Sequence, residues 1–315
     1  MNKPTPKIYR TTNWSSYNRA LINRGNISIW FDPQTQWYAQ LQGKQGRNQT
    51  YSDRAIQCCL MIKCLFRLSL RMVTGFVQSL IQLCGLSWTA PDYSTLCRRQ
   101  KQIDIEISYQ QSHGELHLLV DSTGLKFLGE GEWKRKKHQP EYRRQWRKLH
   151  IGIDAKTLQI RAVQLTTNNV SDSQVLGNLL DQIPPDEQID SVYTDGAYDT
   201  KQCRQVIADR QAHAVIPPRK NAKPWKDTKI SSLARNELLR TVNLAKQCFS
   251  SRTLWKKWSG YHQRSLVETK MHCIKLLGDK LSARNFQSQV NEIHARVAVL
   301  NRFTELGRPH TQVIT

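Results

Sequence analysis

The amino-acid sequence predicts an α/β fold, in which a small helical domain precedes a domain built on a mixed five-stranded sheet with flanking helices. Three observations support this prediction. Apolar residues follow helical spacing between Ser52 and Leu86, short strand-like segments alternate with helical ones from Glu115 onward, and 315 residues suffice for two cores. Hydrophobic residues make up 39% of the chain and charged residues 23%, which is typical of a folded protein rather than a disordered one.

The first part of the chain is predicted to be helical. Residues 1 to about 50 are polar and aromatic without a strong period, so we assign them no structure. The stretch 52–86 contains two helices with a break near 68–71, and a third, shorter helix follows Pro91. Three short helices ending in a basic one are typical of a helix-turn-helix DNA reader, with Arg98, Arg99 and Lys101 facing the phosphates or bases. A small helical bundle with a basic surface gives the same pattern, so both interpretations stay open.

The second part of the chain alternates strands and helices. The predicted elements are strands at 115–121, 147–154 and 158–166, a helix at 171–183, a strand at 190–195, a helix at 200–212, a strand at 213–218 and a long helix from about 259 to 277. This order matches the ribonuclease-H-like fold, whose first three strands are antiparallel and whose later strands are added in parallel through right-handed crossovers.

These elements give the expected domain boundaries. We expect an N-terminal arm and helical domain at 1–110, a ribonuclease-H-like domain at 111–306 and a tail at 307–315. A basic stretch at about 219–257 separates the last strand from the long helix, so we expect it to be an insertion into the second domain.

Three acidic residues are the candidate catalytic and metal-binding groups. Asp121 closes the first predicted strand and Asp195 closes the fourth, and in this fold those two strands lie side by side. An isolated aspartate at a strand end is more often a turn or helix-cap residue. The third candidate, Glu268, lies on the long helix, and the three acids together favour a site over separate structural roles.

The helix around Glu268 has a polar stripe. Tyr261, Arg264, Glu268 and Lys275 are separated by steps of 3, 4 and 7 residues, which places all four on one narrow face at roughly 100° per residue. The apolar residues lie on a broader face that can pack on the sheet: Leu266, Val267, Met271, Ile274 and Leu277. A carboxylate flanked by two cations is also what an ordinary solvated helix face shows.

Divalent cations explain why carboxylates gather in this chain. Mg²⁺ prefers oxygen ligands, and two such ions can activate the attacking group and stabilise the leaving oxygen of a phosphoryl displacement. Without a cation, the carboxylates would repel each other and their pKa values would rise. We therefore expect Asp121, Asp195 and Glu268 to bind two Mg²⁺ ions, with Mn²⁺ as a substitute.

The charge of the chain indicates a polyanionic partner. Lysine and arginine total 47 against 25 acidic residues, so the formal net charge is +22, and double-stranded DNA is the partner that fits best. The alternative is a basic protein whose charge only keeps it soluble, which needs far less charge. A basic loop with interleaved aromatic residues supplies further candidate DNA contacts at Lys134, Arg135, Lys136, Lys137, Arg143 and Arg144. A solvated charged hairpin is the alternative interpretation of that loop.

No apolar stretch approaches the length of a membrane span, and the opening residues lack a signal-peptide core. We therefore expect a cytoplasmic protein with no membrane partner. The eight cysteines are scattered without CxxC pairs, which predicts neither a zinc site nor a disulfide framework.

Three motifs resemble those of the DDE transposases of bacterial insertion sequences, in the insertion-sequence-four and insertion-sequence-five superfamily. They are DSTGLK with Asp121, TDGAYD with Asp195, and Y-x2-R-x3-E-x6-K from Tyr261 to Lys275. The opening segment TTNWSSYNRALINRG is most similar to the insertion-sequence-five branch.

This resemblance implies a ribonuclease-H-like catalytic domain and an N-terminal region that recognises terminal inverted repeats. It also implies Mg²⁺-dependent hydrolysis that exposes 3′-hydroxyls, which then attack target DNA, in a homo-oligomer assembled on DNA. Arg264 and Lys275 would contact phosphate near the scissile bond, and Tyr261 would help to position it. Two alternatives stay open: a metal-dependent nuclease of the same fold, and a catalytically silent DNA-binding repressor.

Overall fold

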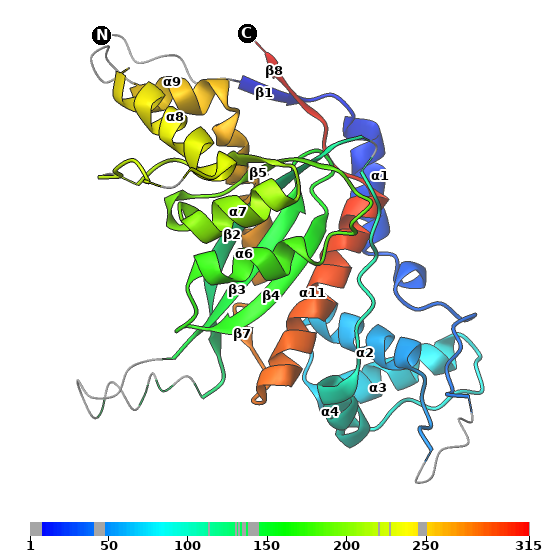
Figure 1. Ribbon diagram of the computed structural model, residues 1–315. Coiled ribbons are helices and arrows are strands. Elements are labelled where there is room, and N and C mark those ends of the chain that lie inside the picture. The colour runs from blue at the N-terminus through cyan, green and yellow to red at the C-terminus, as the bar shows by residue number, and fades with distance from the viewer. Residues whose placement is uncertain are drawn as a thin grey trace. The chain divides into compact units, whose positions relative to one another are not determined.

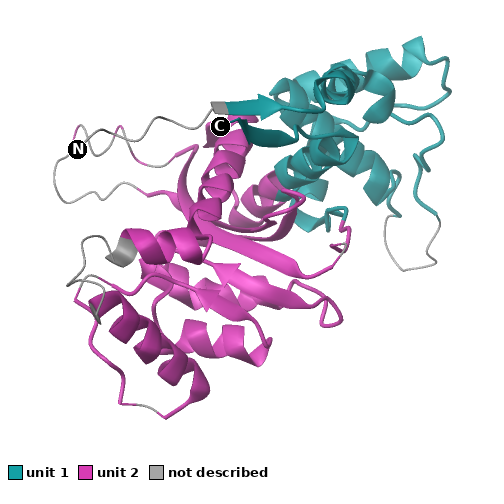
Figure 2. Cartoon of the chain, turned by 90° about the horizontal axis from the view of Figure 1, so that it is seen from above, with its two compact units in different colours: residues 1–108, 294–315 teal, residues 109–293 magenta. Residues whose placement is uncertain are grey.

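The computed structural model describes residues 8–40, 48–112, 114–129, 131, 133, 137, 145–219, 221–226, 228–244 and 251–314. The chain divides into two compact units, shown in two colours in Figure 2. Unit 1 combines residues 1–108 with 294–315, and unit 2 comprises residues 109–293. These units differ from the expected boundaries, because residues 294–306, expected in the second domain, group with unit 1 and residues 311–314 of the expected tail pair with residues 8–11.

Unit 2 is built on a mixed sheet (Figure 1). Its main strands are β2 (Leu116–Phe127), β3 (Arg147–Asp154), β4 (Ile160–Thr167), β5 (Ile189–Tyr193) and β6 (His213–Val215), in the order β4-β3-β2-β5-β6. The pairs β2–β3 and β3–β4 are antiparallel, whereas β2–β5 and β5–β6 are parallel. Helices α6 (Asp172–Leu180) and α7 (Lys201–Asp209) make the crossovers that parallel neighbours require. The predicted mixed sheet with flanking helices is confirmed.

The two faces of strand β2 serve different purposes, because side chains alternate along a strand. Leu116, Leu118 and Val120 join a buried core with apolar residues of α6 and α7, which lie in front of the sheet in Figure 1. The opposite face of β2 contacts helix α10 (Ser265–Leu276), whose Val267 and Ile274 are fully buried. Asp121 lies on this second face.

Three elements of unit 2 differ from the sequence prediction. Strand β2 continues to Phe127 rather than ending at Asp121, because β3 pairs with it along residues 118–125. A sixth strand, β7 (Lys280–Leu281), pairs with the far end of β2 and is too short to leave a sequence pattern. The long helix is interrupted: a 3₁₀ turn, η3 (Tyr261–Arg264), precedes α10 and follows Gly260, which adopts a left-handed φ of 66°.

The basic stretch expected to be an insertion contains two helices, α8 (Ile230–Leu244) and α9 (Ser251–Trp258). The last long helix, α11 (Phe286–Leu306), contributes residues to both units.

Unit 1 contains the predicted three-helix region. Its elements are β1 (Ile8–Thr11), α1 (Trp14–Arg24), η1 (Ile27–Ile29), α2 (Asp53–Phe66), α3 (Leu70–Leu83), α4 (Tyr93–Gln102) and β8 (Thr311–Ile314). The side chains of Ser52, Ser69 and Asp92 accept hydrogen bonds from backbone N–H groups in the first turns of α2, α3 and α4. The break expected near 68–71 falls between Phe66 and Leu70. Within the described ranges, no helix combines the length and apolar character needed to cross a membrane.

Candidate active site

Asp121 and Asp195 lie at the same level of two neighbouring strands. The register of the parallel pair β2–β5 places Leu119 opposite Tyr193, and each aspartate follows two residues later. Asp121 is inside strand β2, whereas Asp195 lies just beyond β5. Its Oδ1 accepts a hydrogen bond of 2.9 Å from the backbone N–H of Ala197, at the start of a 3₁₀ turn, η2 (Gly196–Tyr198). The sheet therefore brings the two predicted aspartates to one place.

Arg264 connects two of the three predicted acids. Its Nη1 donates to Oδ2 of Asp121, and its Nη2 donates to Oε1 of Glu268 over 2.5 Å. The side chains of Arg264 and Asp121 are 19% and 15% exposed, and that of Glu268 is 56% exposed. Glu268 lies in the first turn of α10, where the helix dipole favours a negative charge. Two carboxylates from different elements thus face one positive charge.

Burial and neighbouring charge make Asp121 costly to ionise. Burial raises the pKa of its carboxyl group, and the negative charges of Asp195 and Glu268 raise it further. A hydrogen bond of 2.8 Å from the backbone N–H of Ser122 and the charge of Arg264 oppose this shift. The acids therefore influence each other electrostatically, and the positive charge of Arg264 offsets part of the cost of ionising Asp121.

The donor set suits a hard cation, since carboxylate oxygens are the ligands that Mg²⁺ prefers. Among the residues that the structure describes, no group of three or more His, Cys, Asp or Glu side chains is arranged to hold a metal ion. The guanidinium of Arg264 supplies the positive charge in this arrangement. A metal ion at these carboxylates would have to compete with it.

Tyr261 and Lys275, the other two residues of the motif, lie on the same side of β2 as Asp121. Tyr261 is 9% exposed, and its ring lies 5.7 Å from that of Trp255. Burial raises the pKa of Tyr261, and the charges of Asp195 and Asp121 contribute to the rise. Lys275 donates from Nζ to Oγ1 of Thr123, two residues after Asp121, over 2.8 Å. All four motif residues are thus gathered although Tyr261 and Arg264 belong to a 3₁₀ turn.

A polar network that sequence reasoning missed lies on the other face of β2. Lys148 pairs with Oδ1 of Asp172 at 2.7 Å, and Ser122, next to Asp121, also hydrogen-bonds to that carboxylate. Burial alone would raise the pKa of Asp172, but Lys148 and Ser122 hold it below its ordinary value. In the sequence, Asp172 has only the signature of a helix cap.

His150 lies beside this network and is fully buried. Its Nε2 hydrogen-bonds with Oγ1 of Thr166 at 2.9 Å, and burial lowers its pKa to about 4. The imidazole therefore stays neutral at physiological pH, and the charge of this region is carried by Lys148 and Asp172.

The remaining candidate DNA contacts have different surroundings. Arg99 is 7% exposed, with Nη1 donating to the carbonyl of Tyr51 over 2.9 Å and Nη2 paired with Asp53, so it joins α4 to the start of α2. This differs from the expectation that Arg99 faces DNA. Arg98 is exposed, and Lys137 is exposed with its Nζ 4.8 Å from the ring centre of Trp133. Five others lie outside the described residues: Lys134, Arg135, Lys136, Arg143 and Arg144.

The sheet order, with aspartates at one level of adjacent strands, is consistent with a ribonuclease-H-like domain. Residues 112–302 match a family model described as "Transposase DDE domain", and residues 22–130 match a second model with the same description. Because the first match covers more than half of the chain, the protein belongs to the DDE transposase domain family. Membership of this family indicates an enzyme that cuts DNA in transposition.

Among solved structures, the chain is similar to one in the cryoEM structure of the simian T-cell lymphotropic virus intasome in complex with PP2A regulatory subunit B56 gamma. The match covers 58% of this chain and 63% of that chain, with 14% sequence identity and a TM-score of 0.23.

Proposed function

We propose that this protein is the transposase of a bacterial insertion sequence of the insertion-sequence-four and insertion-sequence-five superfamily, most similar to the insertion-sequence-five branch. It binds the terminal inverted repeats of its element and catalyses Mg²⁺-dependent strand cleavage and strand transfer. The observation that carries the proposal is the bridge that Arg264 makes between Asp121 and Glu268, beside Asp195 on the adjacent strand. In a chain of net charge +22, acidic residues that lie close together are unexpected on the surface, which favours a functional role for them.

Asp121, Asp195 and Glu268 are the residues that would hold the metal, as two Mg²⁺ ions or Mn²⁺ in their place. When bound, divalent cations supply positive charge that activates the attacking oxygen and stabilises the leaving oxygen of phosphoryl transfer. The raised pKa of Asp121 supports this assignment, because a buried carboxylate among other acids needs a positive charge to stay ionised.

Arg264 has two roles in this proposal. Without metal, it neutralises Asp121 and Glu268 and keeps the site assembled. If a metal ion were held by those carboxylates, the guanidinium of Arg264 would be available to pair with a phosphate, for which its planar fork is well suited. Lys275, held near Thr123, contributes a second positive charge, and the buried Tyr261 fixes the position of the turn that carries Arg264.

The DNA partner is proposed from charge. The phosphate backbone of the inverted-repeat ends and of target DNA would be contacted by Arg98 of α4 and by the basic loop, with Lys134, Arg135, Lys136, Lys137, Arg143 and Arg144 as candidates. Two DNA ends must be held together for strand transfer, so we propose a homo-oligomer assembled on DNA.

A strand-transfer assay tests the proposed function. Purified protein is incubated with Mg²⁺, labelled DNA ending in the element's inverted repeats, and a target plasmid. We compare the wild type with Glu268→Gln, and use Glu237→Gln on α8 as the control, since Glu237 is an exposed glutamate in the same unit. Nicks at the repeat ends and joined products, lost in Glu268→Gln and kept in the control, are the expected result.

The same assay separates the alternatives. Nicks without joined products in the wild type would assign the protein as a metal-dependent nuclease. Binding of the repeats without either product would assign it as a catalytically silent repressor.

A further inference from the structure

The two ends of the chain form a two-stranded ribbon in unit 1. Strands β1 and β8 pair antiparallel, with Arg10 opposite Gln312 and Thr11 opposite Thr311, and every residue of β8 is exposed. No third strand pairs with either one in the part of the chain that the structure describes. An isolated two-stranded ribbon is marginally stable in water, so the stability of this one depends on its attachment to the rest of unit 1. Because β8 is exposed, the ribbon can contact a partner molecule.

The base of the ribbon is firmly attached to helix α1. The backbone N–H of Thr12 donates to the carbonyl of His310 over 2.8 Å, and Asn13 exchanges two hydrogen bonds with the segment 308–310, of 2.9 and 2.7 Å. Arg24 donates from Nη2 to the carbonyl of Gly307 over 2.9 Å. These hydrogen bonds therefore fix the end of the ribbon that adjoins α1, while strands β1 and β8 extend away from it.

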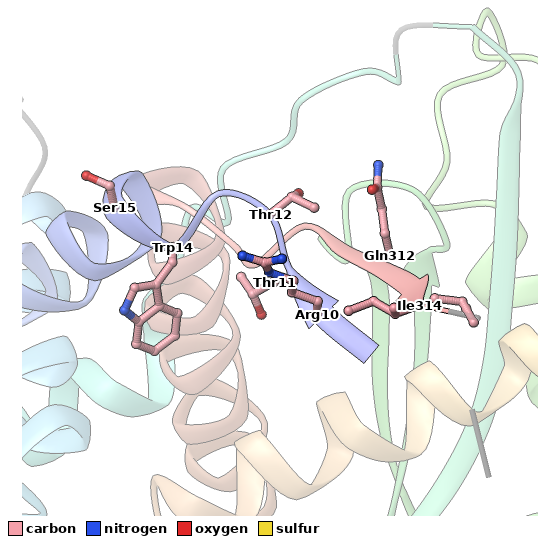
Figure 3. A pocket seen from close by; sticks show the side chains of 8 residues that line it. Arg10, Thr11, Thr12, Trp14, Ser15, Gln312 and Ile314 are labelled. Atoms are coloured by element: carbon pink, nitrogen blue, oxygen red, sulfur yellow. The ribbon is translucent and has the colours of Figure 1, made fainter. Parts of the chain in front are cut away.

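Arg10 and Gln312 are exposed side chains from facing strands. Directly opposed residues of an antiparallel pair point to the same face, and both line a hollow of about 650 Å³ beside Trp14 (Figure 3). Neither side chain has a hydrogen-bond partner among the described residues. Two side chains with several free polar groups thus share one open surface.

The charge around the ribbon has one sign. The segments 8–31 and 307–314 contain no aspartate or glutamate, and they carry Arg10, Arg19, Arg24 and Arg308. This composition complements a polyanion rather than a neutral or basic protein surface.

We propose that the β1–β8 ribbon enters the major groove of double-stranded DNA, where Arg10 and Gln312 read the edges of neighbouring base pairs. A two-stranded antiparallel ribbon fits the width of the major groove. Arginine forms paired hydrogen bonds with guanine and glutamine with adenine. This inference goes beyond the proposed function, which places the DNA contacts on α4 and the basic loop, and rests on it only in taking DNA as the ligand.

A selection experiment in EDTA tests the ribbon without any cleavage. The wild-type protein selects duplexes from a random-sequence library, and fluorescence anisotropy then compares variants on a selected and an unrelated duplex. Arg10→Ala and Gln312→Ala are each expected to weaken binding of the selected duplex about tenfold and to relax the preference at one base position. Arg10→Lys keeps the charge but loses the paired geometry, so it should lose nearly as much. Thr311→Ala is the control and should bind like the wild type, since Thr311 points to the opposite face of β8 and does not line the hollow.

Three outcomes would overturn the inference. They are unchanged binding in Arg10→Ala and Gln312→Ala, an equal loss on selected and unrelated duplexes, or a wild type that selects no sequence. A change of oligomeric state with unchanged DNA affinity would assign the ribbon to pairing with a second copy of the chain instead. Because the selection and the titrations are carried out in EDTA and need no cleavage, failure of the ribbon inference and failure of the proposed cleavage reaction are distinguishable.

Discussion

At the scale of single residues, Arg264 is the centre of the candidate site. It is the last residue of η3, so its backbone position is set by the turn that follows Gly260, while its side chain reaches both β2 and α10. A guanidinium can pair with two carboxylates at once because its donors form a planar fork. The same geometry makes it a competitor for any cation that those carboxylates bind.

Replacing Arg264 should therefore separate metal binding from DNA cleavage. We expect Arg264→Gln to bind Mn²⁺ about tenfold more tightly than the wild type, because a positive charge no longer occupies Asp121 and Glu268. Cleavage of repeat-end DNA should nevertheless fall, since the proposed contact of Arg264 with a phosphate would be lost. Electron paramagnetic resonance of free Mn²⁺ measures the first effect, and Arg98→Gln, an exposed arginine of unit 1, is the control. Equal or weaker Mn²⁺ binding in Arg264→Gln would contradict the competition.

The sequence predicts the position of a residue when that position depends on the order of elements, and fails when it depends on side-chain partners that are distant in sequence. Asp121 and Asp195 could be placed on neighbouring strands because the adjacency of the first and fourth strands follows from the order of elements in this fold. The partners of Arg264 could not be predicted, because they depend on how a turn packs against a strand that is distant in sequence. Arg99 has the residue type of a DNA contact, but its side chain is buried and pairs with Asp53. That pairing depends on how α4 packs against α2, which the sequence does not show. The sequence does not reveal the role of Asp172, because a helix cap and a partly buried ion-pair partner have the same sequence signature.

At the scale of elements, the limits of prediction come from pairing. The segment after Asp121 contains Ser122, Thr123 and Gly124, which indicate a turn by residue type, yet β3 pairs with them and extends the strand. The order of strands and helices in unit 2 was predictable because each element has a clear apolar period. The ribbon β1–β8 was not, since strands from opposite ends of the chain leave no local pattern.

The attachment of the C-terminal segment to α1 depends on a glycine. Gly307 has a φ of 150°, and a Cβ at this position would lie 2.7 Å from the Cβ of Ala20 in α1. Gly307→Ala should therefore lower the free energy of unfolding by about 1–3 kcal/mol, because both the backbone conformation and the close contact are disturbed. Urea unfolding followed by circular dichroism measures the change.

A matched control is available in α3. A Cβ on Gly75 meets no atom within 4 Å, so Gly75→Ala should raise the free energy of unfolding by about 0.5–1 kcal/mol through helix propensity. If Gly307→Ala behaved like Gly75→Ala, the close approach of the C-terminal segment to α1 would be refuted.

At the scale of the whole molecule, the distribution of charge is more informative than its sum. The formal net charge of the chain is +22, whereas in unit 2 burial, and then the negative charges of Asp195 and Glu268, raise the pKa of Asp121. In the proposed function, a divalent cation would neutralise the acids and the surrounding basic residues would hold the DNA. On that proposal, the excess of positive charge and the cluster of negative charge would serve one function.

The salt dependence of DNA binding tests whether the positive charge acts on phosphates. If the protein neutralises about 6–10 phosphates, its affinity for duplex DNA should fall roughly 10³- to 10⁵-fold between about 50 and 200 mM salt, because condensed counterions are released on binding. Anisotropy titrations in EDTA give the slope of log affinity against log salt. Arg98→Gln should reduce the slope by about one if Arg98 contacts a phosphate, whereas Gln312→Ala should lower the affinity and leave the slope unchanged. A chain whose charge serves only solubility would bind duplex DNA weakly at low salt, and neither substitution would alter that binding.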